Sequence, residues 1–161
     1  LVWSLLMSNQ AELYDELLVQ TKALISNESD IIANMANISA LLFERLAGVN
    51  WVGFYRLIED ELVLGPFQGK VACIRIPLGK GVCGTSADTG EVQRIENVHQ
   101  FEGHIACDAT TNAELVIPVK VAGEVIAVLD LDSTVLARFD KQDEQGVLAI
   151  VQMFEEHLAA K

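Results

Sequence analysis

Basic residues are scarce in this chain of 161 residues. It carries 11 Lys and Arg against 23 Asp and Glu, which gives a formal net charge of −12 at pH 7. Nucleic acids and anionic membranes both attract a basic surface, so we expect neither as a partner. No apolar run is long enough to span a bilayer. A small zwitterionic ligand is compatible with this charge.

The chain also lacks an initiator Met at position 1 and a recognisable targeting signal. Leu1 to Met7 is apolar but short, with no basic residue and no small-residue cleavage site, so it is a poor signal peptide. We expect residues 1–8 to be an atypical N-terminal extension or an expression remnant, with Met7 as the real start. Residues 9–161 are expected to form one domain, because about half of the residues are apolar.

Cysteine is limited to three residues, and no Cys-x-x-Cys pair occurs. An odd number of cysteines without an export signal indicates a reducing compartment, so we expect a cytoplasmic protein. In such a compartment the cysteines are free, catalytic or metal-bound. Each one taken alone is also compatible with a small core residue.

Apolar residues at helical spacing predict three helices, at about residues 9–25, at 30–46 and after Asp140. Asn9 and Glu12 are spaced as in a capping box at the start of the first helix, and Asp140 is a good N-cap for the last.

Period-two patterns between these helices predict short strands, at residues 51–57, 62–64, 71–76, 92–98, 115–119 and 125–132. Gly65 to Gly69 is expected to break the ladder, and a short helix is expected at 82–89. Because short turns join the strands, we expect an antiparallel sheet with helices packed on it, an α+β fold.

Two motifs admit more than one interpretation. Gly79 to Gly84 matches G-x-G-x-x-G, but the order of elements lacks the βαβ unit of a dinucleotide site, so we expect a tight turn. His99, His104, Cys107 and Asp108 would be a metal set, but their spacing fits no standard zinc pattern, and we expect no metal. Cys107 with His104 would also suit a cysteine hydrolase, although no third member has a recognisable spacing.

Asp130 and Asp132 end an apolar strand, and at period two their side chains share one face. Two close carboxylates in a partly dry site raise the pKa of one of the two groups, whereas a solvated strand end is the plain alternative.

Trp51, Gly53 and Tyr55 also share a face. The glycine between two aromatics leaves a gap for a ligand, unless the aromatics simply pack in the core.

Five segments together resemble the GAF-domain free methionine-(R)-sulfoxide reductases, namely residues 50–55, 64–70, 79–85, 103–108 and 123–133. The three cysteines, Cys73, Cys83 and Cys107, are the specific part, since most GAF domains are sensors that lack them. The resemblance implies a GAF-like antiparallel sheet flanked by helices. A non-catalytic GAF module that senses a small ligand is the alternative.

The resemblance also implies the chemistry of the cysteines. The activity would be reduction of free L-methionine-(R)-sulfoxide, with no metal, flavin or nicotinamide cofactor in the enzyme. Cys107 would be the nucleophile, Cys73 the thiol that resolves its sulfenic acid as a disulfide, and Cys83 a secondary or alternate thiol. Thioredoxin would then reduce the disulfide, and a homodimer is favoured because GAF domains commonly form one.

Substrate-binding roles follow from the same resemblance. Trp51 and Tyr55 would cage the S-methyl end of the substrate. Glu114, Asp130 and Asp132 would surround its sulfoxide oxygen or its amino group.

Overall fold

The computed structural model describes residues 2–160, apart from the side chains of residues 3–8. Its elements in chain order are α1 (Val2–Ile25), α2 (Ile31–Arg45), β1 (Trp51–Ile58), β2 (Glu61–Gly69), β3 (Arg75–Pro77), α3 (Gly81–Thr89), β4 (Gln93–Ile95), the 3₁₀ turn η1 (Val98–Gln100), β5 (Ala113–Val121), β6 (Glu124–Ser133) and α4 (Lys141–Ala159). Within this described part, no helix is both long and apolar enough to cross a membrane. The expectation that residues 1–8 are an atypical extension concerns residue 1 and the side chains of residues 3–8, which lie outside the described part.

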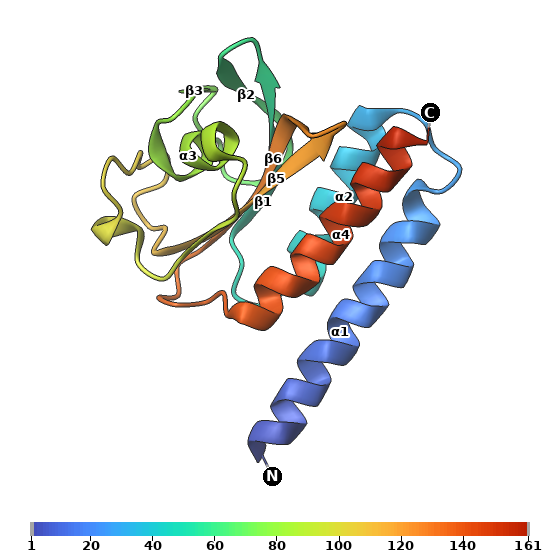
Figure 1. The fold of residues 1–161 in the computed structure, drawn as a ribbon. Helices are drawn as coiled ribbons and strands as arrows, with labels where there is room; N and C mark the ends of the chain where they lie inside the picture. The colour runs from blue at the N-terminus through green and yellow to red at the C-terminus, as the bar shows by residue number, and fades with distance from the viewer. Residues whose placement is uncertain (1, 161) are drawn as a thin grey trace.

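The strands form one antiparallel sheet in the order β3-β2-β1-β6-β5-β4. Helices α1, α2 and α4 lie on one side of it, and α3 lies on the other side among long connections (Figure 1). The predicted α+β architecture in a single domain is therefore confirmed.

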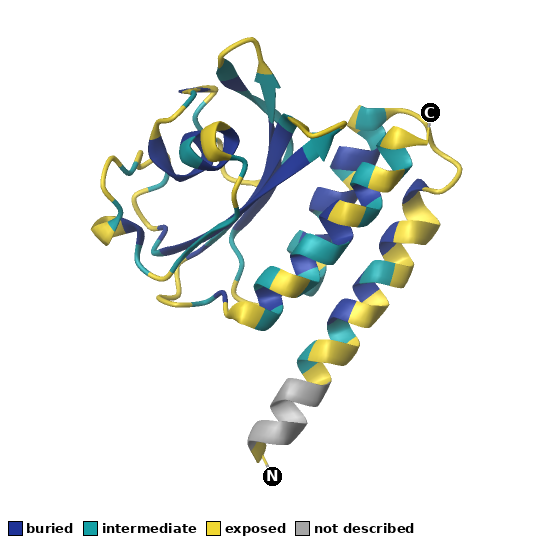
Figure 2. Ribbon diagram, in the orientation of Figure 1, coloured by how far each residue is buried: buried dark blue, intermediate teal, exposed yellow. Residues whose placement is uncertain are grey.

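The main core lies between the sheet and the three long helices, where Figure 2 shows the buried faces of α2 and α4 turned toward the strands. Alternate strand residues supply the sheet side of this core, because successive side chains of a strand point to opposite faces. These are Val52, Phe54, Leu115, Ile117, Leu129 and Leu131. The Phe54 ring meets Phe154 of α4 edge-on at 5.7 Å. The opposite face of the same central strands is thereby left free for a second, smaller cluster.

The predicted β5–β6 hairpin and the start of α4 are confirmed. Ala122 and Gly123 both have positive φ angles, 52° and 80°, which is the conformation of a tight two-residue hairpin turn. The Asp140 side chain accepts a hydrogen bond from the backbone N–H of Asp143, and the Asp143 side chain accepts one from the backbone N–H of Asp140. The two bonds form a capping box. These local signals therefore fix the β5–β6 turn and the start of α4.

The structure corrects two strand predictions. β2 does not end at Gly65 but continues to Gly69, although its ladder with β1 has a bulge where Gly65 and Pro66 have no partner. Pro66 is tolerated because it lies in this bulge and because β3 pairs only with Glu61 to Val63. Residues 71–74, predicted as strand, have no strand conformation, although the Ile74 carbonyl still accepts a hydrogen bond from the Leu64 N–H at 2.9 Å, and β3 is confined to Arg75–Pro77.

The capping box expected at Asn9 and Glu12 was also wrong. α1 begins at Val2 and runs through both residues without interruption, so Asn9 lies inside the helix. The strand predicted at 92–98 is confined to Gln93–Ile95, because the chain forms the 3₁₀ turn η1 from Val98 onward.

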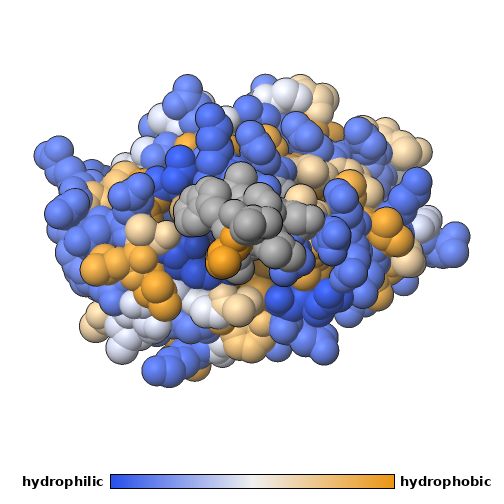
Figure 3. All heavy atoms as spheres, turned by 90° about the horizontal axis from the view of Figure 1, so that it is seen from below, coloured by the Kyte–Doolittle hydropathy of each residue, from blue (hydrophilic) through white to orange (hydrophobic). Residues whose placement is uncertain are grey.

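Viewed along α1 from its N-terminal end, the surface is mostly hydrophilic, and its apolar residues are scattered in small groups (Figure 3). This surface agrees with the net charge of −12.

Candidate active site

A pocket lies on the sheet face that carries α3. It is partly open to solvent and has a cavity volume of about 50 Å³. Its walls come from β1, β5, β6, the start of α3 and two connecting segments. The lining residues are Trp51, Tyr55, Lys70, Val71, Ala72, Ile76, Lys80, Gly81, Val82, Cys83, His104, Ile105, Cys107, Asp108, Thr111, Glu114, Asp130 and Asp132.

Sheet register explains why residues so distant in sequence meet at this pocket. Trp51 on β1 is the cross-strand partner of Asp132 on β6, and Asp132 is the partner of Glu114 on β5. These three residues therefore form one row across the sheet. Asp130 lies in the next row on the same face, opposite Gly53 of β1. Glu114 therefore lies on the same face as Asp130 and Asp132, although sequence spacing alone does not link it to them.

The three acids are crowded and poorly hydrated. Glu114 is 7 % exposed and Asp130 4 % exposed. Burial, and then the neighbouring carboxyl groups, raise the pKa of both Asp130 and Asp132 well above the ordinary value. One carboxyl oxygen on each aspartate, Oδ1, has no hydrogen-bond partner within the described protein. The site therefore offers to a polar ligand two carboxyl groups of raised pKa, each with an unpartnered oxygen.

Cys83, which lies in the first turn of α3, points into the same cluster. Its Sγ lies 3.7 Å from Oε2 of Glu114, and the thiol donates this weak hydrogen bond. Cys83 is 4 % exposed. Burial, and then Asp130 and Glu114, raise the pKa of its thiol well above the ordinary value. This environment keeps Cys83 as a thiol, which opposes its use as a nucleophile.

The other two cysteines form a disulfide. Cys73 bonds to Cys107, with a Cα–Cα distance of 5.4 Å, within the range of protein disulfides. Cys73 comes from the segment between β2 and β3, and Cys107 comes from the loop between η1 and β5. The bond is the one that the family resemblance implied. It ties together the two segments that cover the pocket.

Trp51 and Tyr55 are placed in the pocket wall, but the expected gap at Gly53 does not exist. A Cβ at Gly53 would collide with Phe67 and would lie 2.7 Å from the Trp51 ring. The glycine is needed because Trp51 stacks on Phe67, at 5.2 Å between ring centroids. Of the two alternatives left open by the sequence, the structure shows packing of the aromatic rings, which β1 alone could not predict because the partner residue lies on β2.

The two aromatic residues also hold the segment that carries Cys73. The Trp51 Nε1–H donates to the backbone carbonyl of Lys70 at 3.0 Å, and the Tyr55 hydroxyl donates to that of Cys73 at 3.0 Å. Burial, and then Asp130, raise the pKa of Tyr55, so the phenol remains a donor. These contacts explain why residues 71–74 leave the sheet edge.

The glycine motif before α3 is a tight turn, as expected. Gly79 and Gly81 have positive φ angles of 80° and 64°. A Cβ at Gly84 would lie 2.6 Å from the carbonyl oxygen of Pro77. These glycines bring the start of α3, and with it Cys83, against the sheet.

One group among the described residues has ligand atoms close enough for a metal ion. Cys83, Glu114 and Asp130 each offer one, all within 4.8 Å of one another. The raised pKa values of Cys83 and Asp130 oppose metal binding, because metal ligands must lose their protons. The histidine set considered from sequence forms no such group in the described part of the chain. The His99 and His104 rings lie 6.3 Å apart between centroids, but His99 contacts Asn112 at 2.9 Å and Cys107 is bonded to Cys73.

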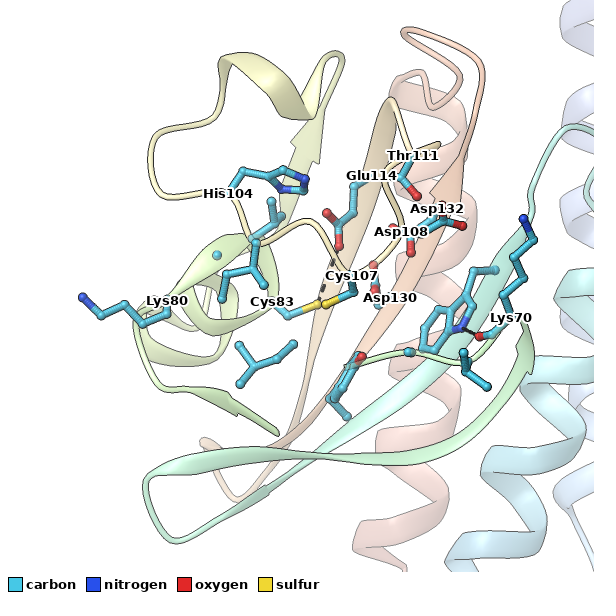
Figure 4. A pocket seen from close by; sticks show the side chains of 18 residues that line it. Lys70, Lys80, Cys83, His104, Cys107, Asp108, Thr111, Glu114, Asp130 and Asp132 are labelled. Atoms are coloured by element: carbon cyan, nitrogen blue, oxygen red, sulfur yellow. Dashed lines mark hydrogen bonds between the residues drawn. The ribbon is translucent and has the colours of Figure 1, made fainter. Parts of the chain in front are cut away.

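Sequence reasoning missed several residues of the pocket rim. Lys70 and Lys80 lie at opposite ends of the pocket with their amino groups pointing away from the acids, and His104 lies above Glu114 (Figure 4). His104 Nδ1 is buried without a hydrogen-bond partner in the described protein. Its position three residues before Cys107 was the only available signal, and it was assigned to metal binding or hydrolysis instead.

Comparisons with known proteins agree with this geometry. The GAF domain family matches residues 30–159. The free methionine-R-sulfoxide reductase of Escherichia coli is 54 % identical over 94 % of this chain and 92 % of its own length. The Saccharomyces cerevisiae protein of the same name is 37 % identical over 95 % and 89 %.

Solved structures give the same result. The free methionine-R-sulfoxide reductase of Neisseria meningitidis, solved in complex with its substrate, has a TM-score of 0.88 and 41 % identity. That match covers 91 % of this chain and 89 % of the other. On this evidence the chain belongs to the free methionine-R-sulfoxide reductase family of GAF-domain proteins.

Proposed function

We propose that this chain reduces free L-methionine-(R)-sulfoxide to methionine. The observation that carries the proposal is the bond between Cys107 and Cys73 beside a pocket with three acid groups. Relatives that are 54 % and 37 % identical are named free methionine-R-sulfoxide reductases. A module that only binds a ligand has no need of a disulfide at its pocket, so the sensor alternative is not favoured.

The reaction uses two thiols. The Cys107 thiolate attacks the sulfoxide sulfur, and the sulfoxide oxygen gains one proton. The hydroxyl then passes to the Cys107 sulfur while its bond to the substrate sulfur and the new Cys107–substrate S–S bond both break, which leaves methionine and a Cys107 sulfenic acid. The Cys73 thiol then attacks the Cys107 sulfur, water leaves, and the disulfide forms. The sulfoxide and two thiols thus give methionine, one disulfide and one water.

Glu114, Asp130 and Asp132 are proposed to serve the sulfoxide oxygen and the amino group of the substrate. Negative charge builds on the oxygen as the S–O bond breaks, and a neutral acid is able to donate a hydrogen bond and a proton to it. The raised pKa values of Asp130 and Asp132 support this role, because these acids stay protonated at higher pH than ordinary carboxyl groups.

Trp51 and Tyr55 are proposed to contact the S-methyl end of the substrate, since both are aromatic and both line the pocket. Their hydrogen bonds to the Cys73 segment support a second role, in which they hold the resolving thiol within reach of Cys107.

Four further proposals concern the whole chain. Residues 9–161 would form the GAF domain, with residues 1–8 an atypical extension. Thioredoxin would be the physiological reductant, the cytoplasm the compartment, and a homodimer the assembly. The odd cysteine count supports the compartment.

The function is tested with the separated R and S sulfoxides of free methionine, with dithiothreitol or a thioredoxin-coupled NADPH assay supplying electrons. We expect turnover of the R form alone, because an asymmetric row of acids and aromatic rings places the sulfoxide oxygen on one side. Absence of R-specific turnover with either reductant would refute the proposal.

The role of Cys73 gives a second expectation. The Cys73→Ser variant should complete one round of reduction, since Cys107 is intact, and then stop in the thioredoxin-coupled assay with Cys107 as a sulfenic acid. Mass spectrometry of the wild-type protein after one turnover should find Cys73 joined to Cys107. A Cys83–Cys107 bond in its place would transfer the resolving role to Cys83.

A further inference from the structure

His104 brings to the pocket a buried nitrogen that no protein group pairs. Its ring lines the pocket and lies above Glu114 (Figure 4), and its Nδ1 atom is buried without a hydrogen-bond partner in the described part of the chain. Buried polar atoms are normally paired, because an unpaired one has lost its hydration without gaining a bond. An atom in this state at the wall of a pocket indicates that a polar group of the ligand is its partner.

Contacts outside the pocket hold the His104 ring in place. The His104 backbone N–H donates to the carbonyl of Phe101 at 3.2 Å. The ring meets His99 edge-on, at 6.3 Å between centroids, and His99 is itself in contact with Asn112 at 2.9 Å. The orientation of His104 is thus supported in the absence of a ligand, which lowers the entropic cost of binding one.

The charges around the pocket leave His104 as the partner for an anionic group. Four acidic residues line the pocket. Lys70 and Lys80 line it too, but both are exposed and their amino groups point away from the acids (Figure 4). Among the described residues of the lining, His104 is therefore the one basic side chain that directs a buried polar atom to the pocket.

Strand order places His104 at one end of the row of acids. Trp51, Asp132 and Glu114 are neighbours across β1, β6 and β5. The partner of Glu114 on its other side is Ile95, on the edge strand β4, and the chain after β4 forms η1 and then reaches His104. Figure 4 accordingly shows Glu114 between His104 and Asp132. The row is thus aromatic at its β1 end and basic at its β4 end.

We propose that His104 binds the α-carboxylate of methionine sulfoxide and selects the free amino acid over a methionine sulfoxide residue in a polypeptide. This inference rests on the proposed function, because it takes the S-methyl group at Trp51 and Tyr55 and the sulfoxide oxygen at the acids. The carboxylate is at the other end of the substrate and then reaches the basic end of the row. There Nδ1–H donates to a carboxylate oxygen, which is a charge-assisted hydrogen bond. A residue within a polypeptide has a neutral amide at this position and loses that bond.

The test compares L-methionine-(R)-sulfoxide with its primary amide, in which a neutral carboxamide of similar shape replaces the carboxylate. With dithiothreitol as reductant, we expect wild-type kcat/KM to favour the acid about 10–100-fold, the range of a hydrogen bond to a charged group. His104→Leu should reduce this preference to about threefold or less, through a higher KM for the acid, because the lost contact is made equally in the ground state and the transition state. Its kcat/KM for the amide should stay within about threefold of wild type.

Two further variants complete the test. His104→Asn is the conservative change, because the Asn amide is able to donate from near the position of Nδ1, and it should recover part of the preference for the acid. His157→Leu is the matched control, since His157 lies on α4, across the sheet from the pocket, where it contacts the Glu28 carbonyl at 2.6 Å. It should keep the full wild-type preference.

A wild-type preference below about threefold would overturn the carboxylate assignment, and so would a full preference in His104→Leu. Equal losses on the acid and the amide in both His104 variants would overturn it as well, because that pattern marks a role in folding or in proton transfer. Failure of the wild-type protein to turn over either compound would instead refute the proposed function itself.

Discussion

Cys107→Ser is expected to abolish reduction of methionine sulfoxide, with kcat falling by at least about 10³-fold. A hydroxyl of ordinary pKa is a far weaker nucleophile than a thiol. The measurement is single-turnover formation of methionine by the reduced variant, which separates the chemical step from recycling of the disulfide.

Cys83→Ser is the matched control. Cys83 is buried among acids that raise its pKa, and it takes no part in the disulfide. We expect this variant to keep the first turnover within about tenfold of wild type, since only its weak contact with Glu114 changes. If methionine formation survived in Cys107→Ser and failed in Cys83→Ser, the roles proposed for the two thiols would have to be exchanged.

Asp130→Asn should lower kcat/KM by a factor on the order of 10²–10⁴, the usual contribution of a general acid. The amide still donates a hydrogen bond to the sulfoxide oxygen but has no proton to transfer. In the wild-type protein the acid is active in its protonated form, so kcat/KM should fall as the pH rises through its raised pKa. The measurement is a pH profile with dithiothreitol, with Asp60→Asn in the exposed β1–β2 turn as the control.

The same substitution should stabilise the folded protein at alkaline pH. Folding raises the pKa of Asp130, so between the unfolded and folded pKa values the folded state binds more protons, and stability falls as the pH rises. Removing the acid removes that penalty. We expect the Tm of Asp130→Asn to exceed that of wild type by a few degrees near pH 9, since 1 kcal/mol corresponds to about 2–4 °C in a domain of this size.

The gain should shrink as the pH falls through the ordinary aspartate pKa of 3.8, below which Asp130 is protonated in both states. A variant that is less stable than wild type at every pH would show that Asp130 is ionised in the folded protein and stabilised by partners. That result would contradict the proposed acid role.

Local sequence signals determined the hairpin turn, the Asp140 cap and the shared face of Asp130 and Asp132. Each depends on residues close together in the chain, where backbone preference and strand alternation act directly. The cysteine triplet, read through the family resemblance, also gave the correct disulfide pair.

Other features were decided only when distant segments met. β2 passes through Gly65 because β1 pairs with it on both sides of a bulge. Residues 71–74 lack strand conformation where Trp51 binds the carbonyl of Lys70 and Tyr55 binds that of Cys73. The gap considered at Gly53 is filled by stacked rings, because Phe67 of the neighbouring strand β2 packs against Trp51. No sequence pattern predicted that Lys70 and Lys80 line the rim of the pocket.

The sequence by itself thus determined which thiols and acids are present and which acids share a strand face. The tertiary structure decided that Glu114 joins Asp132 in one row, that Cys83 is buried against the acids, and that Cys107 rather than Cys73 faces the pocket. The physical reason is that pKa values and access to sulfur depend on burial and on neighbours from other strands, which strand register and loop packing supply and local sequence does not.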